Sequence, residues 1–391
     1  MKSLDRKLDR LRAQPDGRST FIICDAKVAD AERGRGRLGP IGAVAPSDSV
    51  SCYRSRDDFL DCIRRIVARD LVDVMLVSSS VGLELTHRDG ALAASAVTPA
   101  ARVNSGAEIF ALRGDPEMSR RPRSVRALSL ERIGSAGGGG CAANRPDLGF
   151  YAFPYVEDAA TLARALKDYN DFRAEAGLMA FRHVLEVCTP HWLEPIPPEG
   201  LAQFVRDKLT RALAAMPESA RPLFTLIPSG AEVALAELRR FDRRLIVGVA
   251  GGPAGSTFDA FNLIERARAQ GARAASLGRA IAAAEHQEAF LRVLAHVADG
   301  RLDAAAGVHT YHAVLAELGV QPARSLREDL RPGQAPAGGG RASDAVVAPE
   351  RPWGAAAGAP GPQVDPDPDF DAMTLEEKLA YNQKRRDRIF G

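Results

Sequence analysis

The sequence predicts an α/β protein that folds as a closed (β/α)8 barrel, the TIM-barrel architecture. Short apolar runs alternate with amphipathic stretches from residue 19 to about residue 330, a pattern typical of parallel βαβ units buried on both faces. Eight such runs occur, the number that closes a barrel. The length of 391 residues holds a barrel of about 250 residues with extensions. An open doubly wound sheet is the alternative.

The eight predicted strands are apolar runs, and in chain order they cover residues 21–25, 72–78, 108–114, 148–156, 181–187, 222–227, 245–252 and 274–278. Helical patterns lie between most of these runs, at residues 57–68, 159–176, 198–215, 231–241, 257–270 and 280–298. The stretch 115–147 is poorly patterned and includes a run of four glycines. We expect it to form a long surface excursion with one short helix near residues 128–133.

Composition divides the chain into four segments: a charged N-terminal helix (1–18), the barrel (19–330), a linker (331–369) and a terminal helix (370–391). The linker is rich in Pro, Gly and Ala and has little that could form a core, so we expect it to be disordered. Thr374 and Glu377 form a capping box at the start of the terminal helix. A lone short helix is marginal in water, so we expect it to dock on its own subunit or a neighbour, and we expect a homo-oligomer.

Charge and cysteine content exclude several classes of protein. Lys+Arg number 52 and Asp+Glu 50, a balance that does not favour nucleic-acid binding. The five cysteines are odd in number and contain no C-x-x-C pair, which indicates reduced thiols rather than a disulfide framework or zinc ribbon. No apolar run reaches the roughly 18 residues of a membrane helix. We therefore expect a soluble, cytoplasmic protein with no nucleic-acid or membrane partner.

Two consecutive loops at the end of the barrel have the character of a phosphate site. The seventh strand ends in Gly251 and Gly252, the eighth ends in Gly278 and Arg279, and each runs into a helix. Glycines let backbone N–H groups approach an anion, and phosphate sites in such barrels lie at these two loops. Arg279 could add a bidentate cation. The alternative is that these glycines only form tight turns.

The stretch LIVGVAGGPAGSTFDAFNLIERARAQGARAASLGRAIAAAEHQEAFL resembles the DhnA-type class I fructose-bisphosphate aldolases, relatives of the DeoC/LacD aldolase group. The shared signature is an apolar strand ending in a double glycine, then a helix, then a strand ending in Gly-Arg. The resemblance implies a TIM barrel and Schiff-base chemistry on a phosphorylated sugar or ketose. It also implies phosphate binding at the four loop residues just named, and it places Asp25 at the family's acidic position beside the substrate.

The chain departs from this family at the residue that forms the Schiff base. The resemblance implies a lysine on the sixth strand, but no lysine occurs between Lys208 and Lys378. Lys27, two residues beyond Asp25, is a candidate displaced amine; a solvated loop lysine is the alternative. On the fifth strand, Arg182 and Glu186 alternate onto one face and are candidates for acid–base chemistry; an ion pair between them is the structural alternative.

Metal and thiol sites are disfavoured by the same strand pattern. His183 lies on the opposite face of the fifth strand from Glu186, so these two residues and His191 do not form a metal site. Cys188 is a nucleophile candidate by position only. We therefore expect no metal and no cofactor. The sequence favours an aldolase-like carbon–carbon lyase of carbohydrate metabolism with displaced catalytic residues. The alternative is an inactive barrel that binds a phosphoryl ligand or serves as an assembly subunit.

Overall fold

The structure is a computed structural model, and its described residues are 1–15, 17, 20–28, 38, 54–88, 90–105, 125–126, 146–153, 159–188, 197–214, 216–217, 220–251 and 255–333. They all belong to the first of two compact units, Met1–Val346. The predicted terminal helix, all but the first three residues of the predicted linker, and the short helix expected near residues 128–133 lie outside the described residues.

Eight parallel strands close into a barrel in the order β1-β10-β9-β8-β7-β6-β3-β2, which confirms the predicted TIM barrel and excludes an open sheet. Each strand pairs with two neighbours, and the circle closes through β1, which pairs with both β2 and β10. The barrel strands are β1 (Ile22–Lys27), β2 (Val74–Val77), β3 (Thr98–Arg102), β6 (Leu148–Phe153), β7 (Arg182–Val187), β8 (Thr225–Pro228), β9 (Val247–Ala250) and β10 (Ala274–Ser276).

The third barrel strand differs from the sequence prediction. The run at 108–114, which lies outside the described residues, was expected to provide it, but β3 (Thr98–Arg102) occupies that place between β2 and β6. This segment contains Pro99 and two small alanines, and Thr98 is its single β-branched residue, so it lacks the run of β-branched and aromatic residues that marks a strand. Burial between β2 and β6, rather than a high β-strand propensity of its residues, explains why this segment forms a strand.

The helical patterns predicted at 57–68, 159–176, 198–215, 231–241 and 257–270 each correspond to a helix, and further helices occur between β2 and β3 and near both ends of the described chain. The helices are α1 (Ser3–Ala13), α2 (Arg56–Ala68), α3 (Ser79–Leu83), the π-helix η3 (Glu84–Arg88), α4 (Ala91–Ala94), α7 (Ala159–Leu178), α8 (Pro198–Ala214), α9 (Ala234–Phe241), α10 (Thr257–Ala269), α11 (Gly278–Ala283), α12 (Gln287–Ala298), α13 (Ala304–Glu317) and α14 (Leu326–Asp329). A short antiparallel pair, β4 (Asn104–Ser105) and β5 (Val125–Arg126), extends from β3.

The helix expected over residues 280–298 is two helices. The chain leaves helical geometry at Ala284, and α12 begins after His286. The Nδ1 atom of His286 accepts a hydrogen bond from the N–H of Ala289, so the histidine caps the new helix. This interruption creates a turn whose side chains face α2.

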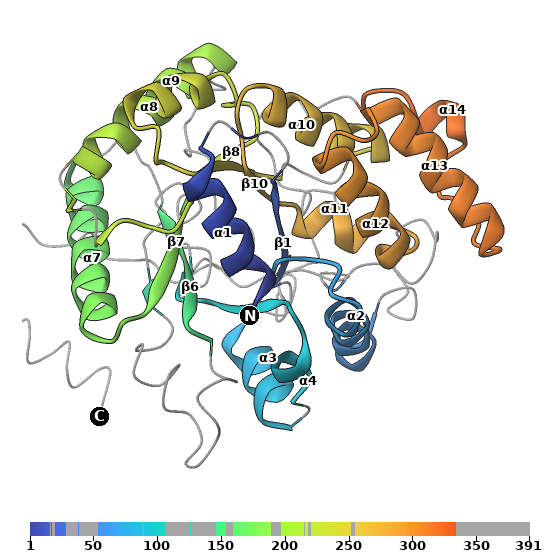
Figure 1. The fold of residues 1–391 in the computed structure, drawn as a ribbon, viewed down its shortest axis with the longest axis horizontal. Coiled ribbons are helices and arrows are strands. Elements are labelled where there is room, and N and C mark those ends of the chain that lie inside the picture. The colour runs from blue at the N-terminus through green and yellow to red at the C-terminus, as the bar shows by residue number, and fades with distance from the viewer. Residues whose placement is uncertain are drawn as a thin grey trace, which may run out of the picture. The chain divides into compact units, whose positions relative to one another are not determined.

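The N-terminal helix α1 closes the barrel at the amino ends of its strands. Leu4, Leu8 and Leu11 are buried among the inward side chains of the strands, such as Ile22 and Phe150. Figure 1 shows α1 lying in front of the strands, inside the ring of outer helices. Apolar burial of three leucines stabilises this arrangement, since each fully buried leucine contributes roughly 1.5–3 kcal/mol. The side chains at the carboxyl ends of the strands are therefore left to form the mouth.

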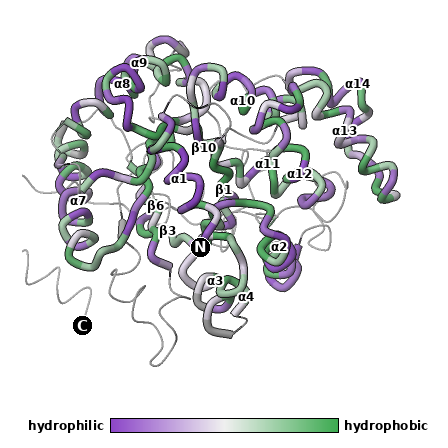
Figure 2. Tube along the Cα trace, viewed as in Figure 1, coloured by the Kyte–Doolittle hydropathy of each residue, from purple (hydrophilic) through white to green (hydrophobic). Residues whose placement is uncertain are grey.

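A second, larger apolar cluster lies between the strands and the outer helices. It includes Ile23 on β1, Met75 on β2 and Leu185 on β7, which are odd-numbered neighbours of the inward residues. In Figure 2, α2 and α7 carry both hydrophobic and hydrophilic stretches. Among the described residues, no helix is long and apolar enough to cross a membrane. A cytoplasmic location stays a prediction.

Candidate active site at the barrel mouth

Two charged side chains meet at the carboxyl ends of the strands. Glu186 shares its face of β7 with Val184, which packs inside the barrel, so its side chain points to the barrel interior as the sequence predicted. Arg102 shares its face of β3 with Ala100, another interior residue. Both lie near the last residue of their strand, the end at which TIM-barrel enzymes carry their active sites.

Arg102 and Glu186 form an ion pair across the strand between them. Ala152 on β6 is paired in register with Glu186, and β6 also pairs with β3. The Nη1 atom of Arg102 donates to the Oε2 atom of Glu186, and each side chain is 19% exposed. A partly buried guanidinium–carboxylate pair at this place provides a positive group and a proton acceptor side by side. The sequence prediction missed Arg102 because it missed β3.

Asn104 fixes the strand that lies between the two charges. Its side-chain Nδ2 donates to the carbonyl of Ala152 at 2.7 Å, and its Oδ1 accepts from the N–H of Ala152 at 2.7 Å. The carboxamide therefore satisfies both backbone groups of Ala152, just beyond the point where the β3–β6 pairing ends. Asn104 is almost completely buried, so this contact is shielded from water. Asn104 therefore joins β4 to β6 at the residue that is paired in register with Glu186.

Arg182 lies at the opposite end of β7 from Glu186, and its contacts stabilise the fold. It points inward, as predicted, but it pairs with Asp5 of α1 at 2.5 Å and with Asp147 at 2.7 Å. The expected alternative, an ion pair between Arg182 and Glu186, does not form, because four residues of strand separate them along the barrel axis. Arg182 instead joins the helix that closes the barrel to the start of β7.

Asp25 and Lys27 are buried on the outer side of β1, not in the mouth. The inward residues of β1 are Ile22 and Cys24, so the alternation directs Asp25 and Lys27 toward the helices. The Nζ atom of Lys27 lies 3.2 Å from the Oδ2 atom of Asp25 and donates to the Oε1 atom of Gln287 on α12 at 3.0 Å. Burial raises the pKa of Asp25, and the neighbouring Lys27 opposes this rise.

This placement corrects two expectations from the sequence. Asp25 was expected to face the substrate at the end of the first strand, and Lys27 was considered a solvated loop residue or a displaced amine. The strand continues to Lys27, so both residues follow its alternation, and both side chains are fully buried. The ion pair offsets part of the cost of burying the two charges, while neither carboxylate oxygen of Asp25 accepts a hydrogen bond from the described residues.

The two glycine loops come together at the mouth. The N–H of Gly251 donates to the carbonyl of Ser276 at 2.5 Å, which joins the loop after β9 to the end of β10. A side chain at Gly278 would overlap the backbone of Ala26, so β1 and the start of α11 approach closely there. The exposed guanidinium of Arg279 donates to the carbonyl of Gly251 at 3.4 Å. Gly252 lies outside the described residues.

Backbone N–H groups at the start of α10 already donate hydrogen bonds to carboxylates of this chain. Asp259 accepts a hydrogen bond from the N–H of Ser256 at 2.8 Å, and Asp329 accepts from the N–H of Thr257 at 2.7 Å. These groups satisfy the N–H groups that a phosphate would use at a helix start. Phosphate binding at these loops would therefore rely on Arg279 and on the first turn of α11.

His183 on β7 has a structural partner and does not enter the mouth. His183 faces outward from β7, where its Nε2 atom lies 3.0 Å from the hydroxyl of Tyr169, and burial lowers its pKa to about 4. Cys24, Cys62 and Cys188 are not disulfide-bonded. In the described part of the chain, no group of three His, Cys, Asp or Glu side chains could hold a metal ion. His191 lies outside that part.

Comparison with known proteins gives the fold a precedent. No family model matches the sequence, and no curated protein matches it with significant similarity. Among solved structures, an archaeal fructose 1,6-bisphosphate aldolase aligns at 18% identity with a TM-score of 0.52, over 76% of this chain and all of that one. The chain has the fold of these aldolases. A second archaeal fructose-1,6-bisphosphate aldolase, with its catalytic lysine bound to a carbinolamine intermediate, aligns at 17% identity and a TM-score of 0.52, with the same coverage.

A third solved structure shows the same barrel in another organism. A protein from Corynebacterium glutamicum aligns at 15% identity with a TM-score of 0.51, over 77% of this chain and 94% of that one. At these identities the likeness concerns the fold alone. In TIM barrels generally, active sites lie at the carboxyl ends of the strands, and the residues of this chain decide the chemistry there.

None of the five described lysines projects into the mouth. Lys2 and Lys7 join α1 to the bottom of the barrel, and Lys27 lies outside the strands. Lys167 pairs with Asp171 on the exposed side of α7, and Lys208 lies over the ring of Phe204 on α8. The described mouth thus offers a carboxylate and a guanidinium in place of an amine.

Proposed function

We propose that this chain is an aldolase-like carbon–carbon lyase that acts on a phosphorylated sugar or ketose, with altered catalytic residues. The Arg102–Glu186 ion pair at the mouth of an aldolase-type barrel is the observation that carries the proposal. It supplies a proton acceptor and a group that stabilises negative charge, the two functions that an aldol cleavage requires.

The cleavage can be written without an amine. Glu186 removes the proton from the hydroxyl group on the carbon that becomes the aldehyde. The adjacent carbon–carbon bond breaks, and its electron pair moves into the neighbouring carbonyl to form an enolate. The guanidinium of Arg102 stabilises the enolate oxygen. Glu186 then returns the same proton to the enolate carbon, so one ketose gives one aldehyde and one ketone with no net change in protons.

The phosphate of the substrate is expected at the far side of the same mouth. Arg279 lies at the start of α11, beside the close approach of Gly251 to β10 and of Gly278 to β1. In TIM barrels the loops after the seventh and eighth strands, with a short additional helix, are the usual phosphate site. An anion held there by Arg279 would leave the rest of the sugar over the opening of the barrel.

A cleavage assay tests this function. Full-length protein is incubated with fructose 1,6-bisphosphate and other phosphorylated ketoses, and the products are followed by ³¹P NMR. The proposal predicts triose phosphates from at least one ketose and their loss in Glu186→Gln, which keeps the size of the side chain. Cleavage that continues at the original rate in Glu186→Gln would contradict it.

A second candidate function is a barrel that binds a phosphoryl ligand, or acts as an assembly subunit, without catalysis. One observation favours it: the two charges of the mouth neutralise one another, and none of the described lysines faces them. Binding of sugar phosphates without any product in the same assay would support this function over the lyase.

A further inference from the structure

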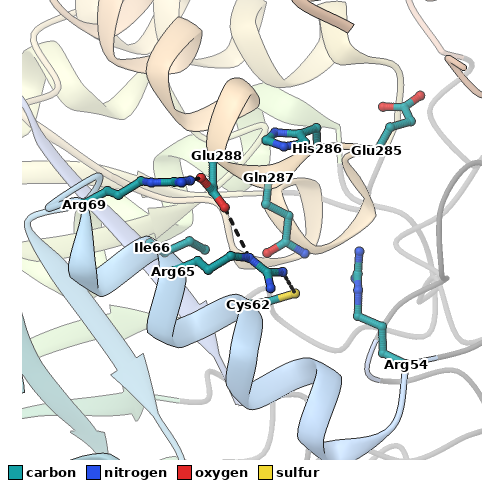
Figure 3. A pocket seen from close by; sticks show the side chains of 9 residues that line it. All are labelled: Arg54, Cys62, Arg65, Ile66, Arg69, Glu285, His286, Gln287 and Glu288. Carbon is teal, nitrogen blue, oxygen red and sulfur yellow. Dashed lines mark hydrogen bonds and ion pairs between the residues drawn. The ribbon is translucent and has the colours of Figure 1, made fainter. Parts of the chain in front are cut away.

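A pocket lies outside the barrel, between α2 and the turn that precedes α12 (Figure 3). One wall is a single face of α2, where Cys62, Arg65, Ile66 and Arg69 follow helical spacing. The pocket has a volume of about 290 Å³. This lies at the small end of the roughly 300–1,000 Å³ usual for ligand pockets, so the space suits a small ligand.

Positive charge is in excess in this pocket. Arg54, Arg65 and Arg69 line it together with the carboxylates of Glu285 and Glu288. Glu288 is already paired with both Arg65, at 3.2 Å, and Arg69. Three guanidinium groups against two carboxylates leave one positive charge without a carboxylate to balance it.

The second carboxylate of the pocket is held by other groups. The Oε2 atom of Glu285 accepts from the hydroxyl of Tyr311 at 3.0 Å, and its Oε1 atom accepts from the N–H of Ala323 at 2.8 Å. Both partners lie outside the pocket lining. The side chain of Glu285 is therefore held toward α13 and the segment after α13. The arginines then determine the net charge of the pocket.

Arg54 is the guanidinium without a carboxylate. Its Nη1 atom donates to the backbone carbonyls of Ala282, at 2.9 Å, and Leu38, at 3.4 Å. Among the described residues, no Asp or Glu pairs with it. In Figure 3 its side chain points toward the turn that carries Glu285, His286 and Gln287. An arginine held by two neutral carbonyls keeps its full charge for a ligand.

The turn opposite the arginines adds hydrogen-bond donors. The Nδ1 atom of His286 accepts from the N–H of Ala289 at 3.2 Å, so in the neutral ring the proton lies on Nε2. The pKa of His286 is lowered by burial and by the nearby charges of Arg65 and Arg69. The start of the 12-residue α12 contributes further partial positive charge. His286 therefore stays neutral, and it is its Nε2–H donor and the start of α12 that favour an anion.

We propose that this pocket binds a small oxyanion, either inorganic phosphate or the phosphoryl group of a metabolite, with Arg54 and Arg65 as its principal ligands. The site is built from α2 and α12 on the outer side of the barrel. It uses none of the mouth residues Arg102, Glu186 or Arg279, so it does not rest on the proposed lyase activity.

Calorimetric titration of the full-length protein with inorganic phosphate tests the site. Arg54→Gln should weaken binding at least about tenfold, because a charge-assisted contact is lost. Arg54→Lys, which keeps the charge, should retain most of the binding. The control is Arg211→Gln, an exposed arginine on α8, which should bind as the original chain does. Thermal melting of each variant checks that the fold is kept.

Arg279→Gln separates this pocket from the mouth. The proposal predicts that phosphate binding which depends on Arg54 persists in Arg279→Gln. It is overturned if the original chain binds no phosphate, if Arg54→Gln binds as tightly as Arg211→Gln, or if Arg279→Gln alone abolishes all binding. Titration with glycerol 3-phosphate then identifies the source of the anion: tighter binding than phosphate indicates a phosphorylated metabolite, and equal or weaker binding indicates the free ion.

Discussion

The guanidinium of Arg102 on β3 and the carboxylate of Glu186 on β7 form an ion pair across Ala152, on the strand that separates β3 from β7. Both residues point into the barrel at the end where TIM-barrel enzymes bind substrate. The pair lies beside Asn104, whose side chain holds both backbone groups of Ala152. The proposed lyase activity assigns proton transfer to Glu186 and charge stabilisation to Arg102, so it requires both residues.

The first prediction concerns the joint action of this pair. Glu186→Gln and Arg102→Gln should each lower kcat/KM by about 10²–10⁴-fold for a cleaved ketose phosphate, the usual effect of a general acid–base group. The double variant should be little slower than the slower single variant, since residues that act as a unit are not additive. Steady-state kinetics measure this, with the exposed Glu317→Gln as control. Additive losses would show that the two residues act separately.

The second prediction separates Arg182 from catalysis. Arg182→Gln removes the contacts to Asp5 and Asp147 and should lower the free energy of unfolding by about 1–3 kcal/mol, as for other hydrogen bonds to charged groups. Turnover at the mouth should remain within a few-fold of the original chain. Urea denaturation and the cleavage assay measure the two effects. Loss of turnover with unchanged stability would contradict this prediction and would indicate that Arg182 acts in the active site.

The third prediction concerns the buried pair on the outer side of β1. Asp25→Asn and Lys27→Met should each destabilise the fold by about 3–5 kcal/mol, because each leaves the other charge buried without a partner. The double variant should be more stable than either single variant. Denaturant unfolding of all three proteins checks this. If Asp25→Asn keeps full stability and loses turnover, Asp25 has the catalytic role that the sequence suggested.

The fourth prediction is a dependence of stability on pH. The pKa of His183 falls from 6.5 to about 4 in the folded chain, so between these values the unfolded chain binds a proton that the folded chain does not. Stability should therefore decrease as the pH falls from 6.5 to 4, by about 3 kcal/mol from this residue. His183→Gln, whose carboxamide can still form a hydrogen bond with Tyr169, should lose that part of the slope. Equal slopes for both proteins would contradict the assignment.

The fifth prediction contrasts two glycines. A methyl group at Gly278 would overlap the backbone of Ala26, whereas a methyl group at Gly177 on α7 would meet nothing within 4 Å. Gly278→Ala should cost about 1–3 kcal/mol, typical of overpacking. Gly177→Ala should gain about 0.5–1 kcal/mol, the helix preference of alanine over glycine. Thermal unfolding of the two variants measures both. A stable Gly278→Ala would mean that β1 and α11 are not in close contact.

The sequence was sufficient for the architecture because apolar strands and amphipathic helices repeat along it. It also predicted the inward face of β7, since alternation along a strand depends only on its register. It failed at β3, where Thr98 to Arg102 pair through burial rather than propensity, and Arg102 was lost with that strand. The only sequence signal for Arg102 was a charged residue at the end of a short run of small residues.

The site on β1 was misjudged for a related reason. The sequence placed the end of the strand at Asp25, and the ends of strands are the least certain part of any such prediction. In the structure the strand extends to Lys27, and both side chains follow the outward face. The partner of Lys27, Gln287, is 260 residues away in the chain, so no local pattern could have shown the contact.

In the proposed lyase reaction, cleavage at the barrel mouth proceeds without a covalent amine intermediate. Intact-protein mass spectrometry after turnover of a phosphorylated ketose in the presence of sodium borohydride tests it most directly. If the proposed reaction is right, product forms and the protein mass stays unchanged after borohydride treatment, since Glu186 and Arg102 form no reducible adduct. A reduced adduct of the mass of the ketose or its fragment, on Lys27 or any other lysine, would contradict the account.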